Sequence, residues 1–210
     1  MKRFALTSAS AFLLVLAGCS DPADKVHKSA TSEPQKAVAP AAAAAKEYAI
    51  TEDSKVGFVG SKVTGKHDGG FKKVAGAIKV ADGKVAGTSE IKIDLTSVWT
   101  DTDRLTGHLK SADFFDVQKF PQATFTATSV EAADAGLYKV TGNLDLHGVT
   151  KSITFPAKIE VGAETVKVNA EFAINRRDFN INYPGKSNDL IRDDVVIKLA
   201  LNAAPGAVKL

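Results

Sequence analysis

Apolar and polar residues alternate with a period of two through most of the chain after residue 46. Five segments carry this alternation most clearly, namely 85–95, 138–146, 153–161, 166–174 and 195–201. Successive side chains of a β-strand point to opposite faces, so the pattern is typical of strands that are buried on one side. Shorter candidates at 54–63, 74–80 and 122–130 bring the expected number to about eight. We therefore expect an all-β, antiparallel fold, either a barrel or a sandwich.

Short turn motifs separate these segments, and one stretch departs from the strand pattern. Turn residues stand at Ala81-Asp82-Gly83, at 133–136 and at His147-Gly148, where glycine and aspartate permit tight reversals. Between Arg104 and Val117, apolar residues recur at helical spacing instead. We expect a short helix there, packed near one mouth of the barrel.

The N-terminus has the features of a secretory leader. Lys2 and Arg3 precede a mostly apolar run at 4–17, which is too short to span a bilayer. The run ends Leu16-Ala17-Gly18-Cys19, which is similar to the lipobox of bacterial lipoproteins, and the chain has a single cysteine. We expect residues 1–18 to be a lipoprotein signal peptide and Cys19 to be acylated with palmitate-type chains that anchor the protein to a membrane. The alternative is an ordinary cleaved signal with an incidental cysteine.

Residues 19–46 form the next predicted unit, an acylated cysteine and a flexible tether. Scattered prolines and an alanine run at 41–45 provide no apolar periodicity, and five alanines do not nucleate a stable helix. As a flexible coil, this segment would hold the following domain, 47–210, roughly 30 Å from the membrane. Ser20 after the cysteine favours the outer membrane, although Asp21 weakens that assignment.

The charge of the chain excludes one class of function. The formal net charge of +3 falls to +1 when Lys2 and Arg3 leave with the leader. No arginine-rich run or basic stripe is present, so nucleic acid binding has no electrostatic support.

Four motif blocks resemble the YceI family of bacterial envelope proteins, also called polyisoprenoid-binding proteins. They are TGKHDGGFKKVAG at 64–76, the segment 91–125, VTGNLDLHGVTKSITF at 140–155 and INRRDF at 174–179. In order and spacing, the likeness covers roughly 48–203. It implies an extended, lipocalin-like antiparallel barrel of about eight strands that holds a long apolar lipid. It also implies a periplasmic location, and related proteins often form homodimers.

The presumed inward faces mix small residues with branched and aromatic ones, and an eight-stranded barrel can be either filled or hollow. With the resemblance, we expect a lipid tunnel. Its predicted wall consists of Phe58, Ile78, Ile91, Val140, Gly142, Leu144, Phe155 and Phe172. The alternative is that the glycines mark bulges in a filled barrel. Such a barrel would serve as an envelope interaction or stress-response protein without a lipid.

Polar residues in the matching motifs are candidates for contacts to a lipid head group. These candidates are Arg104, His108, Asn175 and Arg176, because an arginine fork suits a carboxylate or diphosphate. Arg176 or Arg177 could equally pair with Asp178, Asp193 or Asp194 in a structural bridge. The family usually has a small residue at the position of Arg177 and a glycine at the position of Asn180, so this loop departs from the family pattern.

Metal and enzymatic functions are not predicted. His67, His108 and His147 lie in separate blocks, each beside a turn or loop glycine, where backbone bonding is commoner than metal binding. The sequence lacks a nucleophile elbow and a phosphate-binding glycine loop, and a hydrolase built from His108, Asp113 and a serine has little support. We expect non-enzymatic binding of a polyisoprenoid, isoprenoid quinone or fatty acyl lipid in the bacterial envelope. This binding would serve transport, storage or sequestration, with no cofactor besides that lipid.

Overall fold

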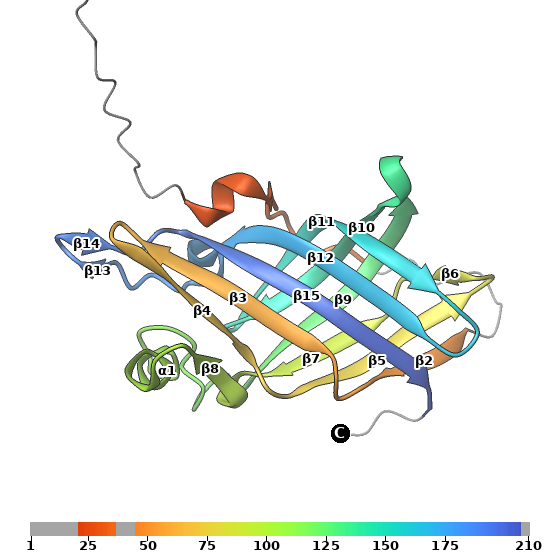
Figure 1. Cartoon of the computed structure of the whole chain (residues 1–210), viewed down its shortest axis with the longest axis horizontal. Helices are drawn as coiled ribbons and strands as arrows, with labels where there is room; N and C mark the ends of the chain where they lie inside the picture. Colours follow the sequence, from red (N-terminus) through yellow and green to blue (C-terminus); the bar gives the residue numbers. More distant parts are fainter. Residues whose placement is uncertain (1–20, 37–44, 207–210) are drawn as a thin grey trace, which may run out of the picture.

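The computed structural model describes residues 21–36 and 45–206, and it is built around a closed antiparallel barrel (Figure 1). Pairing of β12 with β15 completes a ring of eight strands, which confirms the predicted barrel. In ring order the strands are β2 (Lys46–Ile50), β5 (Val74–Ala81), β7 (Glu90–Asp94), β9 (Gln122–Ala132), β10 (Tyr138–Leu146), β11 (Val149–Val161), β12 (Val166–Asn175) and β15 (Asp194–Pro205).

A second group of strands extends the sheet at one end of the barrel. β3 (Lys55–Lys62) pairs with the same edge of β15 as β2 does, but it pairs nearer the beginning of β15. β4 (Gly65–Phe71) pairs with β3, and β8 (Val98–Thr100) pairs with β4. The short strands β13 (Gly185–Lys186) and β14 (Asp189–Leu190) form a separate hairpin. In Figure 1 this hairpin and the β3–β4 turn lie together at the left end of the molecule.

Two predicted turns are tight hairpin connections. Asp82 and Gly83 join β5 to β6 (Lys84–Val85), and His147 and Gly148 join β10 to β11. All four residues have positive φ, from 50° to 74°. Two-residue turns of this kind match the twist of the strands they connect. The turn at 133–136 contains the short 3-10 helix η3 (Asp134–Gly136).

The strand predicted over 85–95 is interrupted. β6 ends at Val85 and β7 begins at Glu90. Between them Thr88 has a φ of 74°, and the Ser89 hydroxyl donates a 3.0 Å hydrogen bond to the carbonyl of Ala86. The apolar and polar residues alternate through 85–95 even though a loop separates β6 from β7. The sequence pattern alone did not reveal this loop.

The helix predicted over 104–117 is wrong in its extent. α1 covers only Asp103–Leu109, and the Ser111 side chain and backbone both bond to the carbonyl of His108 at the helix end. Turns follow up to Pro121. The 3-10 helix η2 (Leu95–Ser97) joins β7 to β8, and another, η4 (Arg176–Phe179), follows β12.

The residues predicted as a flexible tether lie in part against the barrel, and we call the described segment 21–36 the strap. It comprises η1 (Pro22–Lys25), β1 (His27–Lys28) and the residues that follow. β1 pairs in parallel with β12, and the amide of Ser29 donates a 2.8 Å hydrogen bond to the carbonyl of Ala173. Ala23 is fully buried. For the strap the tether prediction is wrong, because backbone pairing and this small buried side chain were not visible as periodicity. Residues 37–44, the predicted signal at 1–18 and Cys19 lie outside the described residues.

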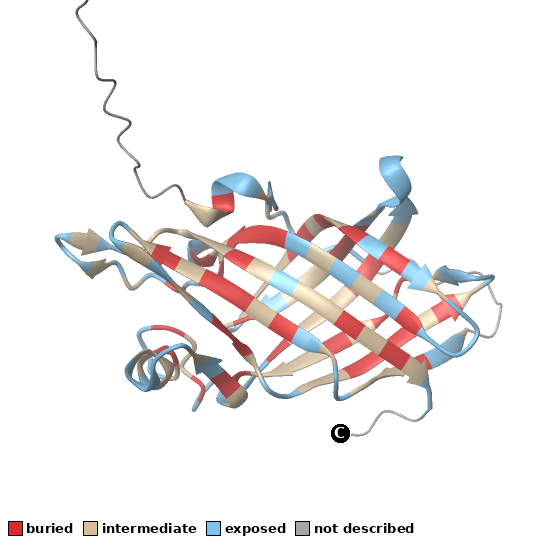
Figure 2. Ribbon diagram, in the orientation of Figure 1, coloured by how far each residue is buried: buried red, intermediate tan, exposed pale blue. Residues whose placement is uncertain are grey.

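Burial alternates along the strands, as Figure 2 shows by the change of colour from residue to residue. In β11, for example, Ile153, Phe155, Ala157 and Ile159 are buried, whereas Lys158 and Glu160 are exposed. No helix in the described ranges has the length and apolar content needed to cross a bilayer.

Candidate functional site

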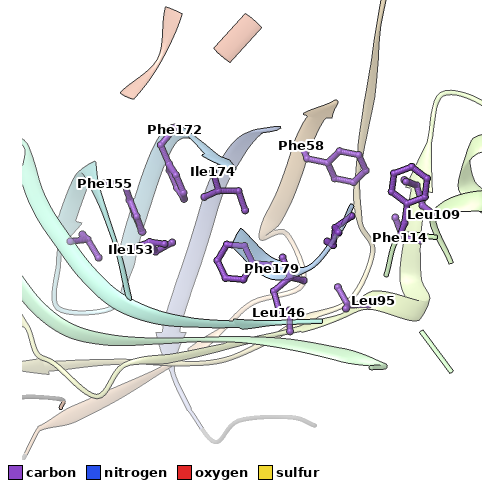
Figure 3. Close-up of a cluster of buried hydrophobic side chains, with 14 of the residues drawn as sticks. Phe58, Leu95, Leu109, Phe114, Leu146, Ile153, Phe155, Phe172, Ile174 and Phe179 are labelled. Atoms are coloured by element: carbon purple, nitrogen blue, oxygen red, sulfur yellow. The ribbon is translucent and has the colours of Figure 1, made fainter. Parts of the chain in front are cut away.

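The barrel encloses a cavity of about 860 Å³. Its wall is formed by inward side chains of the barrel strands together with β3, β4 and α1, and most of these side chains are apolar. Figure 3 shows several of them, including Phe58, Phe155 and Phe172, around the interior. The interior is therefore hollow, which removes the premise of the filled-barrel alternative.

Phenylalanine rings form two groups along the wall. Phe155 and Phe172 stack with centroids 4.1 Å apart and ring planes inclined by 6°, and Phe125 lies 5.6 Å from Phe155. Nearer α1, Phe71 lies 5.8 Å from both Phe58 and Phe115. Such rings provide a large apolar surface of defined shape.

A separate apolar cluster closes the cavity at one end. Tyr48, Val80 and Val166 are buried there and pack with cavity residues that include Val56 and Ile78. The Tyr48 hydroxyl donates to the carbonyls of Gly162 and Ala163 at 3.3 and 3.1 Å. These bonds satisfy its polar group and hold the ring in place.

Polar residues gather at the opposite end, between α1 and the β13–β14 hairpin. Those on the cavity wall are Lys62, His67, Thr102, Arg104, His108, Tyr183, Lys186 and Asp189. We call this end the mouth. Within residues 21–36 and 45–206, neither Arg104 nor Lys186 forms an ion pair, and both are exposed. The mouth therefore presents two cations that do not pair with a carboxylate in the part of the chain that the structure describes.

His108 is held at the mouth by three neighbours. Its Nε2 lies 2.7 Å from Oδ2 of Asp113, and its ring makes edge contacts with Phe114 and Tyr183, both at 5.0 Å between centroids. The helix places His108 one turn after Arg104, on the same side of α1. Of the four predicted head-group candidates, these two line the cavity mouth.

Arg176 reaches the cavity wall but is committed to structural bonds. It is only 4% exposed, and it donates to the carbonyls of Arg192 at 3.0 Å and Ile181 at 2.6 Å. It also donates to Oδ1 of Asp193 at 3.2 Å. Burial lowers the pKa of the Arg176 guanidinium, and the Asp193 charge opposes that shift. This is the bridge to Asp193 that the sequence left open as the alternative.

Asn175 does not line the cavity. Its side-chain oxygen accepts a 2.9 Å hydrogen bond from the amide of Arg177 and caps η4. Asparagine is a preferred residue at such a position. Its contact is local, and the structure does not bring it together with Arg104 and His108.

The predicted wall residues lie on the cavity with one exception. Phe58, Ile78, Ile91, Val140, Leu144, Phe155 and Phe172 line it, and Gly142 does not. Gly142 faces inward, but a Cβ there would lie 2.3 Å from Cζ of Phe125. Phe125 thus occupies the room that the glycine leaves.

Sequence reasoning missed two kinds of wall residue. Val168 and Leu199 stand on faces whose alternation was recognised, so the same signal could have found them. Tyr183 lies in the irregular stretch between η4 and β13, and Lys186 lies in the two-residue strand β13. No periodic signal marks such a segment, and only the fold brings it to the mouth.

The three histidines of the candidate metal site make separate contacts. Nδ1 of His67 lies 2.9 Å from Oδ1 of Asp101, whereas Nδ1 of His147 lies 3.2 Å from the carbonyl of Phe179. His108 contacts Asp113, as described above. In the part of the chain that the structure describes, no group of three metal-ligating side chains comes together.

Comparison with known proteins gives matches over most of the chain. Residues 48–203 match the family described as the YceI-like domain. A UPF0312 protein of Pseudomonas putida is 34% identical over 170 residues, which cover 74% of this chain and 87% of that protein. The crystal structure of BcnA from Burkholderia cenocepacia matches with a TM-score of 0.64 and 28% identity, over 72% of this chain and 96% of that one.

A further solved structure shares the fold. It is a polyisoprenoid binding domain from Saccharophagus degradans, implicated in plant cell wall breakdown. It matches with a TM-score of 0.63 and 23% identity, over 77% of this chain and 99% of that one.

Proposed function

The chain belongs to the YceI-like domain family, and from that premise we propose that it binds one long apolar lipid inside its barrel without catalysing a reaction. The observation that carries the proposal is the cavity of about 860 Å³ with its phenylalanine and aliphatic wall. A dry apolar space of this size loses contact energy unless an apolar molecule fills it. The polyisoprenoid-binding domain of similar fold adds support for an isoprenoid chain.

The volume of the cavity sets the size of the ligand. The cavity of about 860 Å³ lies in the size range of pockets that bury most of a ligand's surface, so it has room for one long apolar chain. Each buried methylene contributes about 0.8 kcal/mol, so such a chain binds tightly without a specific polar contact. Polyisoprenoids, isoprenoid quinones and fatty acyl lipids all meet this requirement.

The head group of the ligand lies, in this proposal, at the mouth between Arg104 and Lys186. These two cations favour a diphosphate or a carboxylate over an alcohol, since neither is paired within residues 21–36 and 45–206. Arg104→Gln should weaken binding of farnesyl diphosphate in a fluorescence competition assay and leave binding of farnesol unchanged. An equal effect on both ligands would remove Arg104 from the head-group site.

The location of the protein is also part of this proposal. The lipobox-like residues before Cys19 support acylation and attachment to a bacterial membrane facing the periplasm. In that place the protein would transport, store or sequester its lipid. Pairing of two copies stays a prediction from the resemblance.

Extraction of the purified full chain with organic solvent, followed by mass spectrometry, tests the central claim. We expect about one apolar lipid per protein molecule, and native mass spectrometry should show the same mass added to the folded protein. Clean extracts from a folded protein that also takes up no added isoprenoid would refute the proposal.

A further inference from the structure

Two hairpins project together beside the cavity mouth, and we call residues 61–66 and 185–191 the tongue. The amide of Val63 donates a 3.2 Å hydrogen bond to the carbonyl of Leu190. Oδ1 of Asp189 accepts from the Thr64 hydroxyl at 2.9 Å, and its other oxygen binds the Lys62 ammonium. These bonds across the two hairpins make the tongue one unit.

The tip of the tongue is apolar and exposed. Val63 is 55% exposed and Leu190 is 49% exposed, and the hydrogen bond between their backbones places them side by side. Single exposed apolar residues are common on protein surfaces. Here two of them lie on neighbouring hairpins that project together at one end of the molecule (Figure 1), and Lys62, Lys186 and Asp189 of these hairpins line the cavity.

The flanks of the tongue carry positive charge. Its two segments contain Lys62, Lys66 and Lys186 against one acidic residue, Asp189. Lys66 and Lys186 are exposed, and neither forms an ion pair among the described residues. An apolar tip between unpaired lysines matches a bilayer surface, whose interior is apolar and whose anionic head groups attract cations.

The strap begins at the base of the tongue. Oδ1 of Asp21 accepts a 3.3 Å hydrogen bond from the Ser61 hydroxyl, and its Oδ2 lies 3.5 Å from Arg192. Cys19 precedes Asp21 by two residues, which span at most about 7 Å of extended chain. A membrane anchor on Cys19 would therefore be held close to the tongue and could not drift on a long tether.

We propose that the tongue docks the barrel on an anionic phospholipid bilayer, with the tips at Val63 and Leu190 in the interface and the cavity mouth facing the membrane. Lys62, Lys186 and Asp189 belong both to the tongue and to the wall of the mouth. A lipid could then pass between bilayer and cavity without crossing water. Lipid transfer in the docked state rests on the proposed function, whereas docking on the bilayer does not.

Single-tryptophan variants test the docked orientation. Trp99 is the only tryptophan, so the full chain with Trp99→Phe and Val63→Trp reports from the tip of the tongue alone. The matched control is Trp99→Phe with Leu137→Trp. Leu137 is 37% exposed and follows η3, at the far end of β10 from its turn at His147. Each protein is reconstituted with vesicles of phosphatidylethanolamine and phosphatidylglycerol that carry brominated acyl chains, which quench nearby tryptophan.

We expect at least twofold quenching of the tryptophan at position 63 and less than a tenth of that effect at position 137. Adding Lys66→Glu should at least halve the quenching at position 63 on anionic vesicles. Equal quenching at both positions, or none at position 63, would overturn the docking proposal. Solvent extraction of the same samples separates the two ideas, since a bound lipid without tip quenching refutes docking alone. Tip quenching in a protein that takes up no lipid refutes the proposed function alone.

Discussion

The ring of Phe125 occupies the space that a side chain on Gly142 would need. A Cβ added to Gly142 would lie 2.3 Å from Cζ of Phe125 and 2.7 Å from the carbonyl oxygen of Thr126. The glycine therefore permits a close approach of β9 and β10 and admits a phenylalanine to the cavity wall. It does not contribute open space to the tunnel.

Gly142→Ala should lower the free energy of unfolding by about 1–3 kcal/mol, the usual cost of overpacking. Because most of the clash is with the Phe125 ring, the cost should fall in a Phe125→Leu background. A double-mutant cycle by urea denaturation measures this coupling. Gly60→Ala is the matched control, since nothing lies within 4 Å of a Cβ there. An equal loss of unfolding free energy in both backgrounds would show that Gly142 and Phe125 are not coupled.

Val168→Trp should block lipid uptake. Val168 lines the cavity, and its neighbour Lys167 is exposed on the opposite face of β12. An indole at position 168 displaces ligand volume, whereas Lys167→Trp places the same group in solvent. Mass spectrometry of extracts should show at least a tenfold loss of lipid from the first variant and none from the second. Comparable lipid in both folded variants would show that the cavity is not the binding site.

Arg176 and Arg177 should differ sharply in their effect on stability. Arg176→Met removes the donor to the carbonyls of Ile181 and Arg192 and should cost about 3 kcal/mol. Arg177 has a side chain 48% exposed, so Arg177→Met should cost less than about 1 kcal/mol. Thermal and urea unfolding provide the comparison. Equal costs would mean that the buried bonds of Arg176 contribute little.

Ala23→Asp should release the strap from the barrel. Ala23 is fully buried against Val59, Ala173 and Val196, and burying a carboxylate in such an apolar contact is costly. Hydrogen exchange of the Ser29 amide, now bonded to Ala173, should accelerate at least tenfold. Exchange in β10 should not change. As a control, Lys25→Ala, at an exposed position two residues after Ala23, should behave as the wild type. A strap that stays protected in Ala23→Asp would contradict this account.

The contact between the two hairpins of the tongue should weaken only in acid. Hydrogen bonds from Lys62 and Thr64 hold the pKa of Asp189 below its usual 3.8. Because the pKa of Asp189 is lower in the folded protein, its stabilising contribution is complete above about pH 4. That contribution is lost as the pH falls through the pKa of the folded state. The amide chemical shift of Val63 should therefore stay constant from pH 8 to 5 and change below pH 3.8. In Asp189→Asn the altered shift should be present at every pH, and a change near neutral pH in the wild type would assign it to another group.

The wall of the cavity was largely predictable from sequence because alternation is a local property of each strand. Val140 and Phe172 belong to segments whose alternation was recognised, and the structure puts both on the cavity. The role expected for Gly142 was wrong because the occupant of its space, Phe125, comes from another strand. For Arg176 the sequence left the head-group role and the structural bridge open, and only the fold brings the carbonyls of Ile181 and Arg192 to its guanidinium.

The strand segments at 138–146, 153–161, 166–174 and 195–201 and two of the tight turns were predictable from sequence, because each follows from residues next to one another. The hollow interior, the position of the strap on β12 and the position of the tongue at the mouth become visible only in the folded chain. The physical reason is that each of these depends on the volume and the hydrogen bonds of residues far apart in the chain. No periodic pattern within one segment contains that information.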